Sequence, residues 1–327
     1  MNFKAYLYKV LFIVVTLYST VLVHADSSVL NNNASIDADN FKKYYIPRPN
    51  PNNQKIAFYL SKPQNKNSYS IIILIGGSTD KDDISSIANF HQYFMKDFAK
   101  IGAGAVTVEP WGVDGNEISK TTFFDHYTRT QILHDYQTVI NYLKISPPSG
   151  WNGKLGLLGV SEGGHIATTL ASIPSNNIIA TVNWSGASDW SWQNELWAGI
   201  QEMYKQNPTC TLSDCKDIKS RLKYDARMKK IIADPSPNKW FFNMTNLYMA
   251  DALKYPRPDY ININGSFLLV TGTKDTLIGS SDDFYKKAES NNVKVTYWRI
   301  ESMDHYIRKR PDLIQNSFNW LQQQLVK

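Results

Sequence analysis

A serine flanked by glycines is the feature of this chain with the clearest chemical potential. The segment KLGLLGVSEGGHIATT (154–169) sets Ser161 between Gly159 and Gly163, after an apolar run and before a helical pattern. A tight strand-to-helix turn of the form Gly-x-Ser-x-Gly exposes the serine hydroxyl as a nucleophile. Such a motif arises by chance in about one chain in ten of this length, so the remaining sequence must supply a base and an acid.

A histidine and an aspartate occupy suitable positions downstream. His305 lies between the last predicted strand and the last predicted helix, and Asp275 directly follows the apolar run FLLVTGT. An imidazole can take the serine proton, and a carboxylate can fix its tautomer and stabilise its charged form. The order Ser161, Asp275, His305, each after a separate strand, predicts a catalytic triad. Glu301 and Asp304 are alternative acids, but Asp304 is adjacent to His305 and neighbouring side chains usually diverge.

Two backbone N–H groups are predicted to stabilise an oxyanion. The first belongs to Glu162, at the start of the helix after the nucleophile. The second belongs to Gly77 or Ser78 in IIILIGGSTDKDD, because a glycine loop after an early strand lets the backbone approach a substrate. The alternative is an ordinary strand-to-helix turn. His165, on the helix after Ser161, is expected to be packed or solvated rather than to act as a base.

Apolar runs of strand length alternate with amphipathic stretches of helix length, which predicts an α/β fold with a mostly parallel sheet covered by helices on both sides. The predicted strands are 55–61, 69–77, 103–111, 154–160, 177–186, 266–273 and 293–300. The predicted helices are 83–101, 128–144, 163–173, 280–290 and 311–325. The alternation stops between about 187 and 258, where we expect an inserted helical cap.

The cap sequence carries two possible recognition features. Its aromatic residues could line a substrate pocket, stack on a ring or form the core of the cap itself; they are Trp190, Trp192, Trp197, Trp240, Phe241 and Phe242. The basic stretch 216–230 could attract an acidic ligand or an anionic membrane surface, although such runs are usually solvated helix faces.

The N-terminus predicts export. Residues 1–25 place Lys4 and Lys9 before a short apolar run, and Val23-His24-Ala25 offers a cleavage site, so we expect a signal peptide and a secreted or periplasmic protein. An uncleaved anchor is the alternative. Residues 26–54 lack apolar periodicity and are expected to form an arm before a domain spanning 55–327.

Composition narrows the class of partner. The net charge of +6 becomes +4 after removal of 1–25, which hold two lysines and no acid, and this is too mild to predict nucleic-acid binding. The only cysteines, Cys210 and Cys215, are expected to form a disulfide in an oxidising compartment. No metal or organic cofactor is predicted.

The GVSEGG turn, the glycine loop, the Asp275 strand end and the His305 loop together resemble the α/β-hydrolase superfamily, from about residue 55 to the C-terminus. The chain is most similar to the branch of dienelactone hydrolases, prolyl-oligopeptidase catalytic domains and acyl-CoA thioesterases. This resemblance implies acyl transfer through a covalent acyl-enzyme. Ile75-Gly76 stands where many members have His-Gly, and a serine in place of the frequent cysteine favours esters or peptides over thioesters.

We therefore expect an exported serine hydrolase that cleaves small carboxylic esters. A serine peptidase acting on short peptides, an acyl thioesterase or an acyltransferase are alternatives within catalysis. A non-catalytic binding protein that keeps the hydrolase fold is the alternative of another class.

Overall fold

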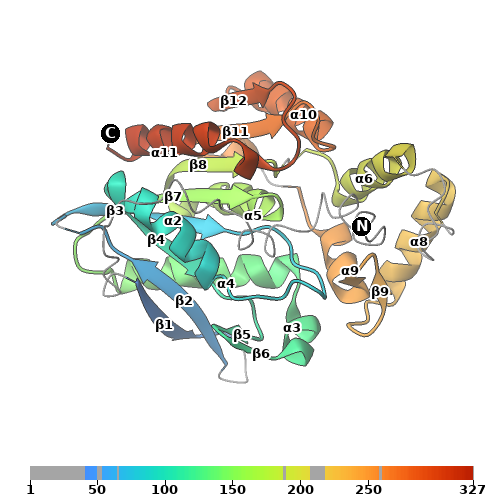
Figure 1. Cartoon of the computed structure of the whole chain (residues 1–327), viewed down its shortest axis with the longest axis horizontal. Coiled ribbons are helices and arrows are strands. Elements are labelled where there is room, and N and C mark those ends of the chain that lie inside the picture. Colours follow the sequence, from blue (N-terminus) through green and yellow to red (C-terminus); the bar gives the residue numbers. More distant parts are fainter. Residues whose placement is uncertain are drawn as a thin grey trace, which may run out of the picture.

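A central sheet organises the computed structural model, which describes residues 41–49, 54–64, 66–186, 189–206, 218–257 and 260–326. The sheet has eight strands in the order β1-β2-β4-β3-β7-β8-β11-β12 (Figure 1). The strands are β1 (Phe41–Pro47), β2 (Lys55–Ser61), β3 (Tyr69–Ile75), β4 (Ala103–Val108), β7 (Trp151–Val160), β8 (Ile178–Trp184), β11 (Ser266–Gly272) and β12 (Val295–Ile300).

Strand direction agrees with the sequence prediction of a mostly parallel sheet. Only β2 runs against its neighbours, since it pairs antiparallel with both β1 and β4 while the other pairs are parallel. All seven residues of β3 are buried, as its run of isoleucines predicts for a strand covered on both faces. The predicted α/β fold class is confirmed.

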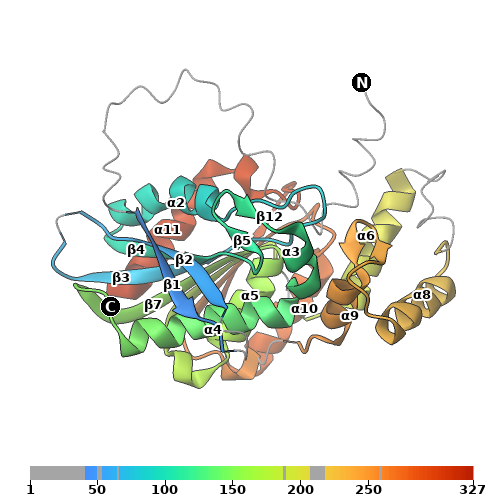
Figure 2. The same ribbon diagram turned by 90° about the horizontal axis from the view of Figure 1, so that it is seen from below.

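Helices cover both faces of the sheet, and each face has its own apolar cluster. Phe98 and Phe318 pack on one face, from α2 (Ala88–Lys100) and α11 (Pro311–Val326). The other face is covered by α4 (Arg129–Ile145), α5 (Glu162–Ala171) and α10 (Ile278–Ser290). In Figure 2, α2 and α11 lie above the sheet and α4 lies below it.

Between β8 and β11 the chain leaves the sheet and forms a helical unit at one side of it (Figure 1). Its elements are α6 (Trp192–Gln206), α8 (Arg221–Ala233), β9 (Trp240–Phe241), β10 (Met244–Thr245) and α9 (Asn246–Lys254). Trp192 and Phe241 are buried in an apolar cluster that the cap shares with Phe123 and Tyr127 of the sheet domain, so these two aromatic residues pack the cap and its contact with that domain. Cys210 and Cys215, the expected disulfide, lie outside the described residues.

Smaller elements complete the fold. They are β5 (Val113–Asp114), β6 (Glu117–Ile118), α3 (Lys120–His126) and three short turns of 3₁₀ helix, η3 (Pro174–Asn176), η4 (Tyr260–Asn262) and η5 (Ile307–Lys309).

Part of the segment expected to be an arm is a strand. β1 pairs with β2 over its whole length, and Arg48, directly after it, forms a buried ion pair with Asp135 of α4 at 2.8 Å. As an edge strand β1 buries only Ile46, and its other residues are half-exposed or exposed, so its sequence shows no strong apolar period. Residues 1–25, the expected signal peptide, lie outside the described part. Within that part, no helix is both long and apolar enough to cross a bilayer.

Candidate active site

Ser161 lies in a strained turn between β7 and α5. Its backbone has φ 54° and ψ −121°, a conformation that residues with a side chain rarely adopt and that strained turns at functional sites do. Its N–H donates to the Trp184 carbonyl at 2.8 Å. A Cβ on Gly159 would lie 2.1 Å from the Gly163 carbonyl oxygen, so the chain can reverse this tightly only with glycine there.

Ser161, His305 and Asp275 form a continuous hydrogen-bonded relay. The His305 Nε2 lies 3.0 Å from the Ser161 Oγ, and the Nδ1 lies 3.0 Å from the Asp275 Oδ2. All three residues are buried. If the Nδ1 carries the proton toward the carboxylate, the Nε2 can accept the serine proton, which is the arrangement that activates a hydroxyl.

Adjacent strand ends bring the acid to the histidine. β11 and β12 are parallel neighbours, so the loops that follow them meet at one edge of the sheet. The Lys274 N–H donates to the Met303 carbonyl at 2.9 Å, and a Cβ on Gly272 would lie 2.0 Å from that same oxygen. The Leu277 N–H donates to the second Asp275 oxygen at 3.0 Å. The aspartate is therefore held on both oxygens.

The two alternative acids make contacts elsewhere. Asp304 accepts hydrogen bonds from the Tyr306 N–H at 2.9 Å and from Lys309. Glu301 is exposed and accepts from the Thr273 hydroxyl at 3.3 Å.

The two expected oxyanion donors lie on segments that pack together. A Cβ on Gly163 would lie 2.2 Å from the Ile75 carbonyl oxygen, so the end of β3 rests directly on the first turn of α5. The Thr79 N–H already donates to the Tyr127 hydroxyl at 2.9 Å. Gly77 and Ser78, both buried, remain the candidates for the second donor beside the Glu162 N–H.

The Glu162 side chain is buried in a polar network that the sequence did not reveal. It accepts from the Arg129 Nε at 2.7 Å, from the Tyr248 hydroxyl, and from the Tyr127 hydroxyl at 3.4 Å. Burial raises the pKa of Tyr248 well above its ordinary value, and the Glu162 charge adds to this. Burial alone would lower the pKa of Arg129, but Tyr248 and Glu162 keep it raised.

Asn183, at the end of β8, joins the first turn of α5 to the segment that follows β8. Its amide nitrogen donates to the Gly186 carbonyl at 2.9 Å and to the Gly164 carbonyl at 3.3 Å, while its oxygen accepts from the Gly186 N–H at 2.8 Å. A single asparagine at a strand end carries no sequence signal for such a role.

His165 connects α5 to the cap. Its Nε2 lies 3.0 Å from the Glu195 Oε2 on α6, and the other Glu195 oxygen accepts from the Ser280 hydroxyl of α10 at 3.0 Å. All three side chains are buried, and the histidine at the Ser161 hydroxyl is His305. It has the packed role expected for it.

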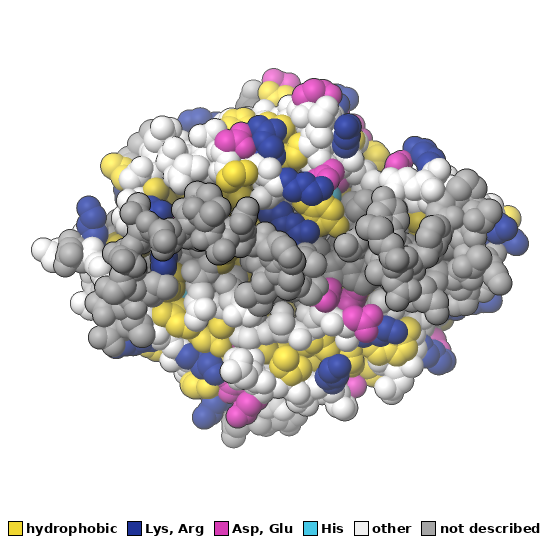
Figure 3. Space-filling view, viewed as in Figure 1, with side chains coloured by type: hydrophobic (Ala, Val, Ile, Leu, Met, Phe, Trp, Pro, Cys, Tyr) yellow, Lys and Arg dark blue, Asp and Glu magenta, His cyan; other side chains and the backbone are white. Residues whose placement is uncertain are grey.

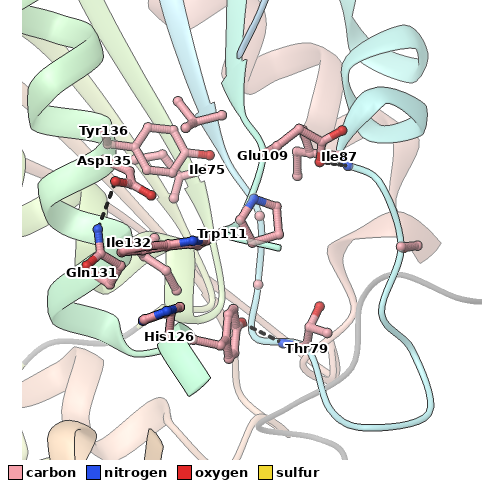
Figure 4. A pocket seen from close by; sticks show the side chains of 16 residues that line it. Ile75, Thr79, Ile87, Glu109, Trp111, His126, Gln131, Ile132, Asp135 and Tyr136 are labelled. Carbon is pink, nitrogen blue, oxygen red and sulfur yellow. Dashed lines mark hydrogen bonds between the residues drawn. The ribbon is translucent and has the colours of Figure 1, made fainter. Parts of the chain in front are cut away.

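A small pocket borders the glycine loop on the side of β4 (Figure 4). Its volume is about 50 Å³, room for one or two water molecules or a small chemical group. Trp111 lies between His126, stacked at 3.8 Å, and the Arg48 guanidinium, 4.0 Å from the ring centre. The carboxylates of Glu109 and Asp135 that line the pocket are already hydrogen-bonded.

The basic stretch of the cap lies largely on the exposed side of α8. Arg221 pairs with Asp225 one turn later at 2.8 Å, and Lys223, Lys229 and Lys230 are exposed. On the face seen in Figure 3, basic side chains are interspersed with acidic ones. Binding of an acidic ligand or an anionic surface by this stretch stays a prediction.

Comparison with known families gives one match. The family model Hydrolase_4, described as serine aminopeptidase, S33, matches residues 84–307, more than half of the chain. A comparison with curated proteins gave no match.

Solved structures with this fold include esterases and peptidases. Est1E from Butyrivibrio proteoclasticus with bound ferulic acid is 17% identical, with a TM-score of 0.58 over 87% of this chain and 100% of that one. A Pyrococcus furiosus esterase is 16% identical, with a TM-score of 0.56 over 87% and 92%. A proline iminopeptidase from Mycobacterium smegmatis is 12% identical, with a TM-score of 0.57 over 87% and 99%. At these identities the likeness shows the fold.

Proposed function

Because the chain belongs to the Hydrolase_4 (serine aminopeptidase, S33) family of α/β-hydrolases, we propose that it is an exported serine hydrolase that cleaves small carboxylic esters. The observation that carries this proposal is the buried relay from Ser161 through His305 to Asp275, with 3.0 Å at each step. A hydroxyl in this arrangement needs no other activation to become a nucleophile.

The reaction has two halves. His305 takes the Ser161 proton as the oxygen attacks the ester carbonyl carbon, and the Asp275 carboxylate stabilises the imidazolium. The oxyanion accepts hydrogen bonds from the Glu162 N–H and from the N–H of Gly77 or Ser78. His305 then gives its proton to the departing alcohol. Water, deprotonated by His305, attacks the acyl-enzyme and releases the acid and the free serine.

Three buried carboxylates of the described residues are already paired, which favours esters over peptides with a free N-terminus. An aminopeptidase must hold the substrate ammonium group, and a carboxylate is the natural partner for it. Glu162 is already paired with Arg129, and Asp275 with His305. Glu195 is bound to His165 and Ser280.

The family description and the iminopeptidase among the structural neighbours support a serine peptidase acting on short peptides as the second candidate. A thioesterase, an acyltransferase and a non-catalytic binding protein are further alternatives, but no specific observation favours any of them.

A substrate panel separates these candidates. We expect purified protein to hydrolyse p-nitrophenyl acetate and butyrate, and Ser161→Ala to lose at least about 10³-fold in kcat. Turnover of aminoacyl or prolyl anilides without ester hydrolysis would select the peptidase. Ester hydrolysis that Ser161→Ala retains would exclude Ser161 as the nucleophile.

Export and the disulfide are proposed on the sequence alone. N-terminal sequencing of protein recovered outside the cytoplasm is expected to begin at Asp26. Non-reducing peptide mapping is expected to find Cys210 linked to Cys215. A protein beginning at Met1, or free thiols at both cysteines, would contradict these proposals.

A further inference from the structure

We propose that Tyr127 is a positioning residue for the second oxyanion donor, because its hydroxyl holds the glycine loop against the buried Glu162 carboxylate. The inference rests on the proposed function. It assigns a positioning role to a tyrosine outside the hydrogen-bonded relay of Ser161, His305 and Asp275.

The hydroxyl bridges two segments that build the oxyanion site. It accepts the Thr79 N–H at 2.9 Å, the bond drawn from Thr79 in Figure 4, and donates to the Glu162 Oε2 at 3.4 Å. A phenol has one proton to donate and lone pairs to accept, so both bonds can form together. Glu162 supplies the first predicted donor, and Thr79 lies two residues after Gly77.

The ring and the hydroxyl of Tyr127 are both held by neighbouring side chains. Its ring stacks on Phe123 at 4.4 Å and on Tyr248 at 5.4 Å. The carboxylate to which it donates is held in turn by the Arg129 Nε at 2.7 Å and by the Tyr248 hydroxyl. These contacts fix the position of the Tyr127 hydroxyl, and its hydrogen bond to the Thr79 N–H therefore fixes the position of the loop.

The glycine loop needs such a tether. Gly76, Gly77 and Thr79 border the pocket of about 50 Å³, so this side of the loop faces a void instead of packed side chains. Gly76 and Gly77 have no side chain with which to anchor themselves. A displacement of about 1 Å in a group that contacts the transition state can cost about 10²-fold in rate, so freeing Thr79 should move the donor out of position.

The matched pair Tyr127→Phe and Tyr248→Phe tests this role. Both variants remove a hydroxyl that donates to Glu162 and keep the stacked rings, but only the first frees Thr79. With p-nitrophenyl acetate we expect Tyr127→Phe to lower kcat by about 10- to 100-fold with KM within about twofold. Tyr248→Phe, which leaves the Thr79 bond in place, should lower kcat less than Tyr127→Phe does. Equal losses in the two variants, or a change confined to KM, would overturn the inference.

Amide hydrogen exchange of Thr79 provides a readout that does not depend on turnover. In the wild-type protein this amide should exchange slowly. In Tyr127→Phe it should exchange at least about tenfold faster than in the wild type, whereas in Tyr248→Phe its exchange rate should not rise in this way. Exchange in the wild type at the rate of an open loop would refute the tether even if Tyr127→Phe does not fold. If the Thr79 amide is protected but no hydrolysis depends on Ser161, the proposed function is wrong and the hydrogen bond from Thr79 to Tyr127 is still supported.

Discussion

At the scale of single residues, Asp80 is a carboxylic acid buried directly after the glycine loop. It is 1% exposed; its Oδ1 accepts the Asp82 N–H at 2.7 Å, and its Oδ2 has no hydrogen-bond partner among the described residues. Burial raises the pKa of Asp80 to about 7, and the nearby Asp83 and Asp82 charges contribute. The folded protein therefore keeps a proton that the unfolded chain loses near pH 4.

This difference makes stability depend on pH. Between about pH 4 and 7 the unfolded state binds fewer protons at this position than the folded state, so the Asp80 contribution to the free energy of unfolding falls as pH rises, and levels off above pH 7. Asp80→Asn lacks this dependence and should gain stability relative to the wild type between pH 4.5 and pH 8. Urea unfolding at both pH values measures it. An Asp80→Asn gain that does not change with pH would contradict the assignment.

At this scale the sequence predicted where chemistry-bearing residues lie but not what surrounds them. Ser161, Asp275 and His305 follow separate strands, and strand ends meet at one sheet edge, so their approach could be predicted from topology. The Glu162 partners Tyr127, Arg129 and Tyr248 come from a loop and from helices distant in sequence. No periodic pattern marks them, because such contacts depend on how helices dock.

At the scale of elements, β7 and α5 form the unit on which the proposed mechanism depends. Their packing needs glycine at Gly159, where a Cβ would lie 2.1 Å from a backbone oxygen. Gly156 of the same strand has its nearest neighbour at 3.5 Å, an ordinary contact with the end of the Leu325 side chain. The sequence predicted the strand, turn and helix well, since the apolar run and the small-residue helix are both strong local signals.

Gly159→Ala and Gly156→Ala therefore form a matched pair within β7. We expect Gly159→Ala to cost about 3 kcal/mol of unfolding free energy and to reduce hydrolysis, because backbone atoms must shift. Gly156→Ala should stay within about 1 kcal/mol of the wild type. Chemical denaturation of both variants measures the difference, and similar stabilities would show that the turn tolerates a side chain.

At the scale of the whole molecule, the cap is joined to the sheet domain by buried polar contacts as well as by apolar packing. Glu195 of α6 contacts both His165 of α5 and Ser280 of α10. The insertion itself could be predicted, because the alternation of strands and helices stops there. The attachment of the cap could not be predicted. Neither could β1, because the buried ion pair beside it joins Arg48, the residue after β1, to an aspartate 87 positions later.

Two glutamates of α6 test the attachment. Glu195→Ala removes the buried partner of the His165 Nε2 and the acceptor of the Ser280 hydroxyl, and should cost about 3 kcal/mol. Glu202→Ala removes only contacts with Lys205 and Gln206 on an exposed face, and should cost about 0.5 kcal/mol or less. Thermal unfolding of the two variants compares these costs. Equal shifts in Tm would mean that the Glu195 contacts add nothing to the attachment of the cap.

The claim that Ser161 is an activated nucleophile can be tested directly by covalent labelling. Purified protein is treated with a fluorophosphonate, digested and mapped by mass spectrometry, with Ser161→Ala and His305→Ala as controls. We expect one adduct, on the peptide that contains Ser161, absent from Ser161→Ala and formed at least about 10²-fold more slowly in His305→Ala. An unlabelled Ser161 in folded wild-type protein, or an adduct on another residue that survives Ser161→Ala, would contradict the account.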